Sequence, residues 1–167
     1  MRRVLVVRLD GAGDVLLAGP AVRAVAAAAE VTMLCGPDGA GAARLLLGVA
    51  EVLTCASPWV LADPPPVRTA DLDRLVASLA ARRFAETVVL TSFHQSPLPT
   101  ALVLRLAGIA RITGASVDYP GSLLDVRLRP GEGLDDDLPE AERMASIPAP
   151  AGCPAADDGR LAFRPPP

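Results

Sequence analysis

The sequence contains no lysine, so all 16 of its basic residues are arginines. This absence excludes mechanisms that depend on a lysine amine, such as a phosphate-binding P-loop, Schiff-base catalysis or a biotinyl carrier. The arginines are dispersed along the chain and the net charge is −3, so no basic patch of the kind that binds nucleic acid is predicted. We therefore expect no nucleic-acid partner.

Metal-binding and disulfide-forming residues are also scarce. His94 is the single histidine, and the three cysteines are widely spaced, so we expect no metal site and no cofactor. An odd number of cysteines without a CxxC pair argues against a secreted disulfide framework, and we interpret Cys35 and Cys55 as small buried side chains near strand ends. The apolar run after Arg3 ends at Asp10 and is too short for a signal peptide or a membrane span, which favours a cytoplasmic protein.

Aromatic residues make up only 3% of the chain, whereas 51% of it is hydrophobic. The core must therefore consist of leucine, valine, isoleucine and alanine, which suits helices packed closely on a sheet. A chain of 167 residues has the length of one domain, and a domain of this size buries roughly 70% of its unfolded surface.

Apolar β-branched runs alternate with helical patterns along the first two thirds of the chain. Strands are predicted at residues 3–9, 30–36, 49–56, 86–92 and 110–114, and helices at 14–29, 39–48, 70–84 and 97–108, with a surface loop at 57–69. Pro20 interrupts the first helical pattern, so we expect a short first segment and a second helix that begins near this proline. The alternation predicts an α/β fold, a Rossmann-like parallel sheet flanked by helices.

The alternation fails after Asp118. One further helix is predicted at residues 139–147, and Pro148 and Pro150 end it. We expect a Rossmann-like domain over residues 1–147 and a proline-rich interdomain linker or truncated tail over residues 148–167, with a last extended segment.

Ligands of open parallel sheets bind beyond the carboxyl ends of the strands. Three predicted loops lie at this edge: Asp10–Asp14, Gly36–Gly41 and Ser92–Ser96. Gly11 and Gly13 supply the first two glycines of a dinucleotide-binding motif, but the third glycine is missing and no acidic residue ends the second strand. The sequence therefore disfavours a nicotinamide or flavin cofactor.

The run from Val6 to Ala24 (VVRLDGAGDVLLAGPAVRA) resembles the opening signature of glycosyltransferase family 9, the ADP-heptose:lipopolysaccharide heptosyltransferases. The segment Arg111–Gly114 (RITG) resembles a strand of that family, and Glu140–Arg143 (EAER) lies where its members often carry an ExxR motif. Together these matches span residues 1 to about 145.

The resemblance implies a GT-B glycosyltransferase, in which two Rossmann-like domains face each other across a cleft. The N-terminal domain binds the acceptor and the C-terminal domain binds the nucleotide-sugar donor, and transfer is inverting and metal-independent. This chain would be the N-terminal half, with a glycan or glycolipid acceptor, a donor held by a missing second domain and a peripheral contact with the inner membrane. Its role would lie in lipopolysaccharide core or other cell-envelope glycan synthesis, and the fragment alone is expected to be inactive.

The general base of the family maps onto Asp14. A carboxylate suits this role because an inverting displacement needs a group that takes the proton of the attacking hydroxyl, and Gly11 and Gly13 would let the acceptor approach the backbone closely. The alternative is that Asp14 only caps the helix that follows. For Asp10 the alternatives are a turn residue that bonds the backbone ahead of it and an acceptor ligand.

Further candidate acceptor-binding residues follow the predicted strand at 86–92: Ser92, His94, Gln95 and Ser96. We expect these side chains to face the cleft, where His94 and Gln95 would bond acceptor hydroxyls; the alternative is solvated residues at the start of a helix. Family members often have a carboxylate and a lysine in this segment, so the resemblance does not identify the acceptor. Arg8 would meet an acceptor anion or pair with Asp10 or Asp14.

A second hypothesis is a non-catalytic Rossmann-like binding module, because one fold hosts many functions. The reading frame downstream of Pro167 distinguishes the two hypotheses: a continuing domain with a glycine-rich nucleotide loop supports the transferase.

Overall fold

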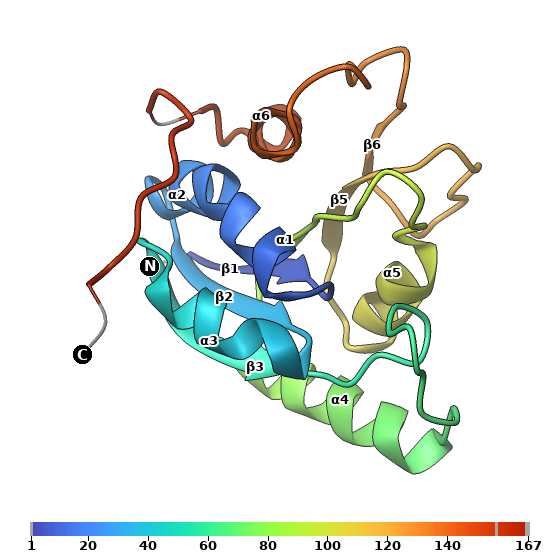
Figure 1. Ribbon diagram of the computed structural model, residues 1–167. Coiled ribbons are helices and arrows are strands. Elements are labelled where there is room, and N and C mark those ends of the chain that lie inside the picture. The colour runs from blue at the N-terminus through green and yellow to red at the C-terminus, as the bar shows by residue number, and fades with distance from the viewer. Residues whose placement is uncertain (1, 156, 166–167) are drawn as a thin grey trace.

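Six parallel strands form one sheet within residues 2–155 and 157–165, which the computed structural model describes (Figure 1). The strands are β1 (Arg3–Arg8), β2 (Glu30–Cys35), β3 (Val49–Thr54), β4 (Glu86–Val89), β5 (Arg111–Ala115) and β6 (Val126–Leu128). Their order, β3-β2-β1-β4-β5-β6, reverses between β1 and β4. In a doubly wound sheet this reversal opens a crevice at the carboxyl ends of the strands.

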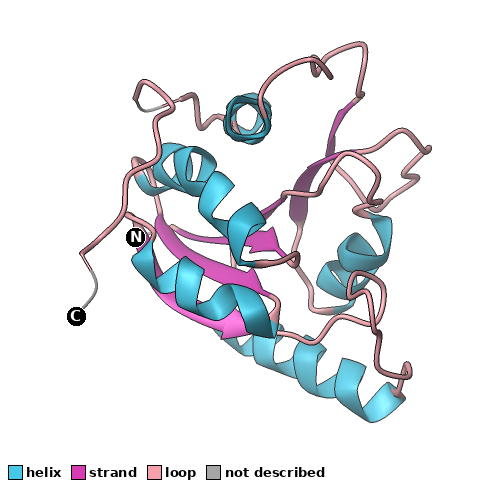
Figure 2. Cartoon of the chain, viewed as in Figure 1, coloured by secondary structure: helices cyan, strands magenta, loops and turns pink. Residues whose placement is uncertain are grey.

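Helices cover both faces of the sheet (Figure 2). One face carries α1 (Ala12–Leu17), α2 (Gly19–Ala26), the short 3₁₀ helix η1 (Pro37–Gly39), α3 (Ala40–Leu45) and α6 (Glu140–Ser146), and the other carries α4 (Thr69–Arg82) and α5 (Leu98–Leu106). Successive strand residues point to opposite faces, so Val4 and Val6 of β1 pack in the first core and Leu5 and Val7 in the second.

The predicted α/β fold is confirmed, including the break in the first helical pattern. Helix α1 ends at Leu17, and α2 restarts at Gly19 with Pro20 in its first turn. Gly108, expected to end the helix at 97–108, adopts a left-handed φ of 80° just after α5. Strand β6 was not predicted, because a strand of three residues shows no periodicity.

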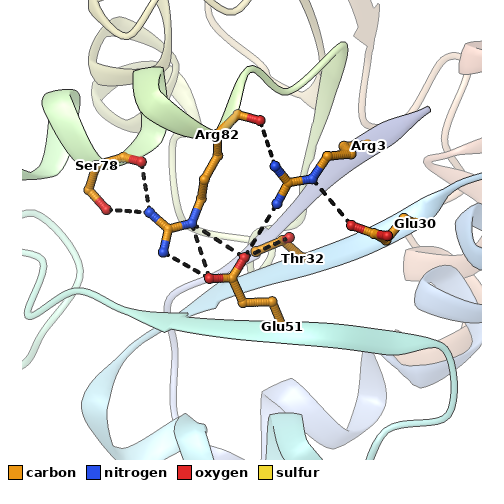
Figure 3. A network of polar contacts seen from close by, with 6 residues as sticks. All are labelled: Arg3, Glu30, Thr32, Glu51, Ser78 and Arg82. Atoms are coloured by element: carbon orange, nitrogen blue, oxygen red, sulfur yellow. Dashed lines mark hydrogen bonds and ion pairs between the residues drawn. The ribbon is translucent and has the colours of Figure 1, made fainter. Parts of the chain in front are cut away.

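The amino-terminal end of the sheet is held by a network of charged side chains (Figure 3). Arg82, the last residue of α4, donates to both carboxylate oxygens of Glu51 on β3, with the shortest contact at 2.8 Å. Arg3 on β1 pairs with Glu51 at 3.5 Å and with Glu30 on β2 at 3.2 Å. This network joins helix α4 to three strands at the end opposite the crevice.

The segment that follows α6 packs back against the domain (Figure 1). After the 3₁₀ helix η2 (Ala149–Ala151), Cys153 is buried, Asp157 pairs with Arg23 of α2, and the amide of Arg164 donates to the carbonyl of Leu45. Residues 156, 166 and 167 of the predicted linker, and residue 1 of the predicted domain, lie outside the described residues. The division at residue 147 stays a prediction.

No helix among the described residues is both long and apolar enough to cross a membrane. These residues also contain no group of three or more histidine, cysteine, aspartate or glutamate side chains placed to hold a metal ion.

Candidate functional site

Arg8 is the centre of the site. It is the last residue of β1, and its side chain is fully buried. Its Nη2 atom lies 3.1 Å from Asp14 Oδ1, 3.1 Å from Glu140 Oε1 and 3.0 Å from the Ser92 hydroxyl. Its Nε is 2.8 Å from Asp10 Oδ2, an ion pair by distance without the alignment of a hydrogen bond. One guanidinium therefore joins the loop after β1 to the loop after β4 and to helix α6.

Asp14 stands in the first turn of α1 with 41% of its side chain exposed. The N-cap of this helix is Gly11, and no side chain caps it. The interpretation of Asp14 as a capping residue is therefore wrong. Its carboxylate is held on one side by Arg8 and is open to solvent on the other, so it is accessible to a ligand.

Asp10 differs from Asp14 because only 6% of its side chain is exposed. Its carboxylate accepts hydrogen bonds from the Ser92 hydroxyl at 2.9 Å and from the Gln95 amide at 2.5 Å. These partners belong to the loop after β4, so the side chain of Asp10 bonds across the crevice to another loop. The predicted pairing of Arg8 with Asp10 or Asp14 is confirmed, and it involves both.

The three loops singled out in the sequence surround one pocket of about 330 Å³, which we call the Asp14 pocket. Its lining residues are Leu9, Asp10, Gly11, Asp14, Gly36, Asp38, Val60, Leu61, Ala62, Ser92 and Gln95. Of the residues predicted to bind the acceptor, Asp10, Gly11, Ser92 and Gln95 line this pocket. Gly13 is exposed on α1 and is not among the lining residues.

His94 and Ser96 line a neighbouring pocket of about 280 Å³ instead, and Gln95 belongs to the walls of both. His94 is exposed, and its ring meets that of Phe93 edge to face at a centroid distance of 4.9 Å. The Ser96 hydroxyl accepts a hydrogen bond from the amide of Leu98, at the start of α5. The structure therefore divides the Ser92–Ser96 segment between two pockets.

Glu140 and Arg143 of helix α6 were not among the predicted site residues. Glu140 pairs with Arg8, and the buried Arg143 lines the second pocket and donates to the carbonyl of Thr91 at 3.3 Å. The signal in the sequence was the spacing of three residues in EAER, which places both side chains on one side of a helix. The spacing does not predict which strand this side of the helix packs against.

The burial expected of the cysteines is confirmed for Cys35 and only in part for Cys55. Cys35 at the end of β2 is buried, and Cys55 is half-buried. Burial raises the pKa of both thiols, against a small opposite effect of Arg44 on Cys35. Both cysteines therefore behave as small apolar side chains, as predicted.

The strand order, the glycine-containing turn after β1 and a polar crevice at the carboxyl edge define a Rossmann-like domain. Its fold matches the N-terminal Rossmann-like fold of GT-B glycosyltransferases. One similar solved structure is that of E. coli ADP-heptose lipopolysaccharide heptosyltransferase II, with a TM-score of 0.65 and 22% identity; the match covers 100% of this chain and 44% of that chain. Another is E. coli heptosyltransferase WaaC with ADP-2-deoxy-2-fluoro heptose, with a TM-score of 0.70 and 18% identity; the match covers 96% of this chain and 52% of that chain. A glycosyl transferase family 9 protein from Veillonella parvula DSM 2008 is also similar, with a TM-score of 0.67 and 16% identity; the match covers 96% of this chain and 43% of that chain.

These identities, 16–22%, show a shared fold. The sequence matches no protein-family model and shows no significant match to a curated protein. The chain spans about half the length of the solved structures that it matches.

Proposed function

We propose that this chain is the acceptor-binding half of an inverting glycosyltransferase of the heptosyltransferase kind, with Asp14 as the general base. The observation that carries the proposal is the Asp14 carboxylate, which opens into a pocket at the crevice while Arg8 holds it at 3.1 Å. A general base must be both accessible and fixed in position. Asp14 meets both requirements and is not used as a helix cap.

The reaction is a single displacement. A hydroxyl of the acceptor lies in the Asp14 pocket, and its proton passes to the Asp14 carboxylate as its oxygen attacks the anomeric carbon of the donor. The bond from that carbon to the diphosphate breaks, the nucleoside diphosphate leaves, and the configuration inverts. Arg8 keeps Asp14 in place, and Asp10 holds Ser92 and Gln95 as the facing wall of the pocket.

The donor comes from outside this chain in the proposal. One of the similar structures, WaaC, contains ADP-2-deoxy-2-fluoro heptose, so we propose a nucleotide sugar bound by a second domain that faces the crevice. The acceptor is a glycan or glycolipid of the cell envelope, such as the lipopolysaccharide core. The transfer is metal-independent and takes place in the cytoplasm, at the surface of the inner membrane when the acceptor is a lipid.

Replacement of Asp14 by asparagine tests the proposal. The assay joins this chain to the donor-binding half of E. coli heptosyltransferase II and measures transfer from ADP-heptose to core oligosaccharides. We expect Asp14→Asn to lower turnover by about 10²–10⁴-fold, the usual contribution of a general base. The melting temperature should fall by only about 2–4 °C, because Asp14 makes no cap bond and Arg8 keeps its ion pairs with Asp10 and Glu140.

Asp73→Asn is the matched control, because Asp73 is an exposed carboxylate on α4 that does not line the pocket. It should keep most of the turnover. Wild-type turnover in the Asp14→Asn fusion would contradict the base role. A chain that binds a glycan but transfers nothing in any fusion supports the non-catalytic binding module.

A further inference from the structure

Three acceptors surround a single nitrogen atom of Arg8. Its Nη2 lies 3.0 Å from the Ser92 hydroxyl, 3.1 Å from Asp14 Oδ1 and 3.1 Å from Glu140 Oε1. This nitrogen carries two hydrogens, so it cannot donate a full hydrogen bond to all three acceptors. Nη1 does not relieve the competition, because it faces the thioether of Met144 at 3.1 Å, which is a weak acceptor. Asp14 therefore shares with Glu140 the donor that holds it.

This sharing matters for a base. A carboxylate paired with an arginine binds a proton weakly, because the cation favours the charged form. A general base works better when its affinity for the proton is higher, up to the operating pH. Fixing a base with a guanidinium and keeping it basic are therefore conflicting requirements. A second anion on the same guanidinium reconciles them, because it draws on the cation without displacing the base.

Glu140 is placed to be that second anion. It is the first residue of α6, and its carboxylate is 28% exposed. Met144 and Ile147 at the other end of α6 are fully buried in the core, so the helix is held against the domain. On the far side of Glu140, Arg143 Nη1 lies 3.8 Å from Oε2, beyond hydrogen-bond distance. The close cation of Glu140 is therefore Arg8.

The other charged groups around Asp14 are differently engaged. Asp10 meets Arg8 through Nε and accepts hydrogen bonds from the Ser92 hydroxyl and the Gln95 amide. Asp38 of η1 lies in the wall of the same pocket but is exposed, so water screens its charge. Glu140 is thus the carboxylate that competes with Asp14 for the same nitrogen atom.

We propose that Glu140 is a positioning residue for the base: it takes a share of the charge and hydrogen bonding of Arg8, so that Asp14 stays fixed and still accepts a proton. The inference rests on the proposed function, because it takes Asp14 to be the general base. Helix α6 thereby contributes to the reaction through Arg8, without contact between Glu140 and the acceptor.

The test is a nuclear magnetic resonance titration of the chain alone, which follows the carbon-13 signal of the Asp14 carboxyl group. Asp14→Asn identifies this signal, and spectra are compared at each pH at which the amide spectrum is that of the folded chain. In Glu140→Gln the signal should titrate at a pH lower by about 0.5–1 unit, because a like charge close to Asp14 has gone. An equal or higher titration midpoint would overturn the proposal.

Glu142→Gln is the matched control. Glu142 is an exposed residue in the same first turn of α6, so its loss changes the interaction with the helix dipole to the same extent. It lies two positions from Glu140 and points to another side of the helix, and its variant should titrate within about 0.2 pH unit of wild type. Glu140→Ala serves if the glutamine variant unfolds, and it should shift the titration in the same direction.

Turnover of the fused enzyme gives a second readout. Glu140→Gln should lower kcat by about threefold to tenfold and move the acid limb of the pH–rate profile to lower pH, with KM unchanged. A purely structural role would lower the melting temperature and leave the profile in place. The titration does not require turnover, so a failed base test with Asp14→Asn and a failed role of Glu140 are distinguishable.

Discussion

Arg8 is a fully buried arginine surrounded by three carboxylates, those of Asp10, Asp14 and Glu140. Taking a guanidinium out of water costs several kcal/mol, and close ion pairs offset this cost only when the geometry is good. Here each carboxylate comes within 3.1 Å. Asp10 lies on the loop that directly follows Arg8, and Asp14 lies in the first turn of the helix after that loop. The residue therefore fixes the position of Asp14 and depends on it in turn.

We predict that Arg8→Met destabilises the domain by about 3–5 kcal/mol, the cost of leaving buried charges without their partner. Urea unfolding followed by circular dichroism measures the change. Arg74→Met is the control: Arg74 is 77% exposed and pairs with Asp71 within α4, so its loss should cost less than about 1 kcal/mol. Similar losses in the two variants would show that Arg8 has no special structural role.

At the scale of elements, the Asp14 pocket depends on two loops that approach each other closely. A Cβ atom on Gly36, just after β2, would lie 2.7 Å from the carbonyl oxygen of Leu9, just after β1. This neighbour is backbone and cannot rotate away. A side chain at position 36 would therefore push apart the loops that carry Asp10 and Asp38.

We predict that Gly36→Ala destabilises the domain by about 1–3 kcal/mol, the usual cost of forcing extra atoms into a packed site. Gly41→Ala is the matched control, because Gly41 lies in α3 and a Cβ there meets nothing within 4 Å. It should stabilise the chain by about 0.5–1 kcal/mol through helix propensity. Thermal melts of the two variants decide, and equal shifts in the same direction would refute the close approach.

The elements that the sequence predicted well are those with long patterns. Alternating β-branched and helical segments located the first five strands, and Pro20 located the break between α1 and α2, because both effects are local. The strand β6 and the partners of Glu140 were not predictable in this way. Glu140 meets Arg8 across 132 positions of sequence, and such a pair depends on how α6 packs on the sheet.

The candidate site was predicted only in part, because the sequence pattern locates the strand ends but not the direction of the side chains that follow them. The topology of a parallel sheet brought Asp10, Asp14 and Ser92 to one crevice, as expected from the carboxyl ends of their strands. The topology does not predict the turn of the chain at Phe93, which places His94 and Ser96 in a different pocket from Ser92. The direction of a side chain within a loop follows from packing that the sequence pattern does not contain.

At the scale of the whole molecule, two clusters of charged side chains occupy opposite ends of the sheet. The network of Arg82, Glu51 and Arg3 holds the amino-terminal end (Figure 3), and the Arg8 cluster lies at the carboxyl end. Hydrogen bonds from Arg82 lower the pKa of Glu51 below its ordinary value of 4.5, against a smaller opposing effect of burial. The network is therefore sensitive to acid.

We predict that the chain loses stability as the pH falls below about 4.5, and that Glu51→Gln makes this loss less steep. The unfolded chain protonates Glu51 at a higher pH than the folded chain, so the contribution is complete above the unfolded pKa and disappears as the pH falls through the folded pKa. Its size is under about 1 kcal/mol, because Glu51 is 38% exposed. Urea unfolding at a series of pH values measures the slope.

Glu132→Gln is the control for this experiment, because Glu132 is an exposed glutamate paired only with the exposed Arg129 among the described residues. Its slope should match wild type. An unchanged slope in Glu51→Gln would show that the network at the amino-terminal end does not set the response to acid.

The partition between the two pockets is a single side chain, and Asp10 holds it through a hydrogen bond to its amide. In the proposed function, an acceptor that spans this partition must occupy both pockets while its nucleophile lies at Asp14. A glycan whose linkage directs its second sugar elsewhere would occupy the Asp14 pocket alone. The linkage between the two sugars would then be selected by the distance between the two pockets.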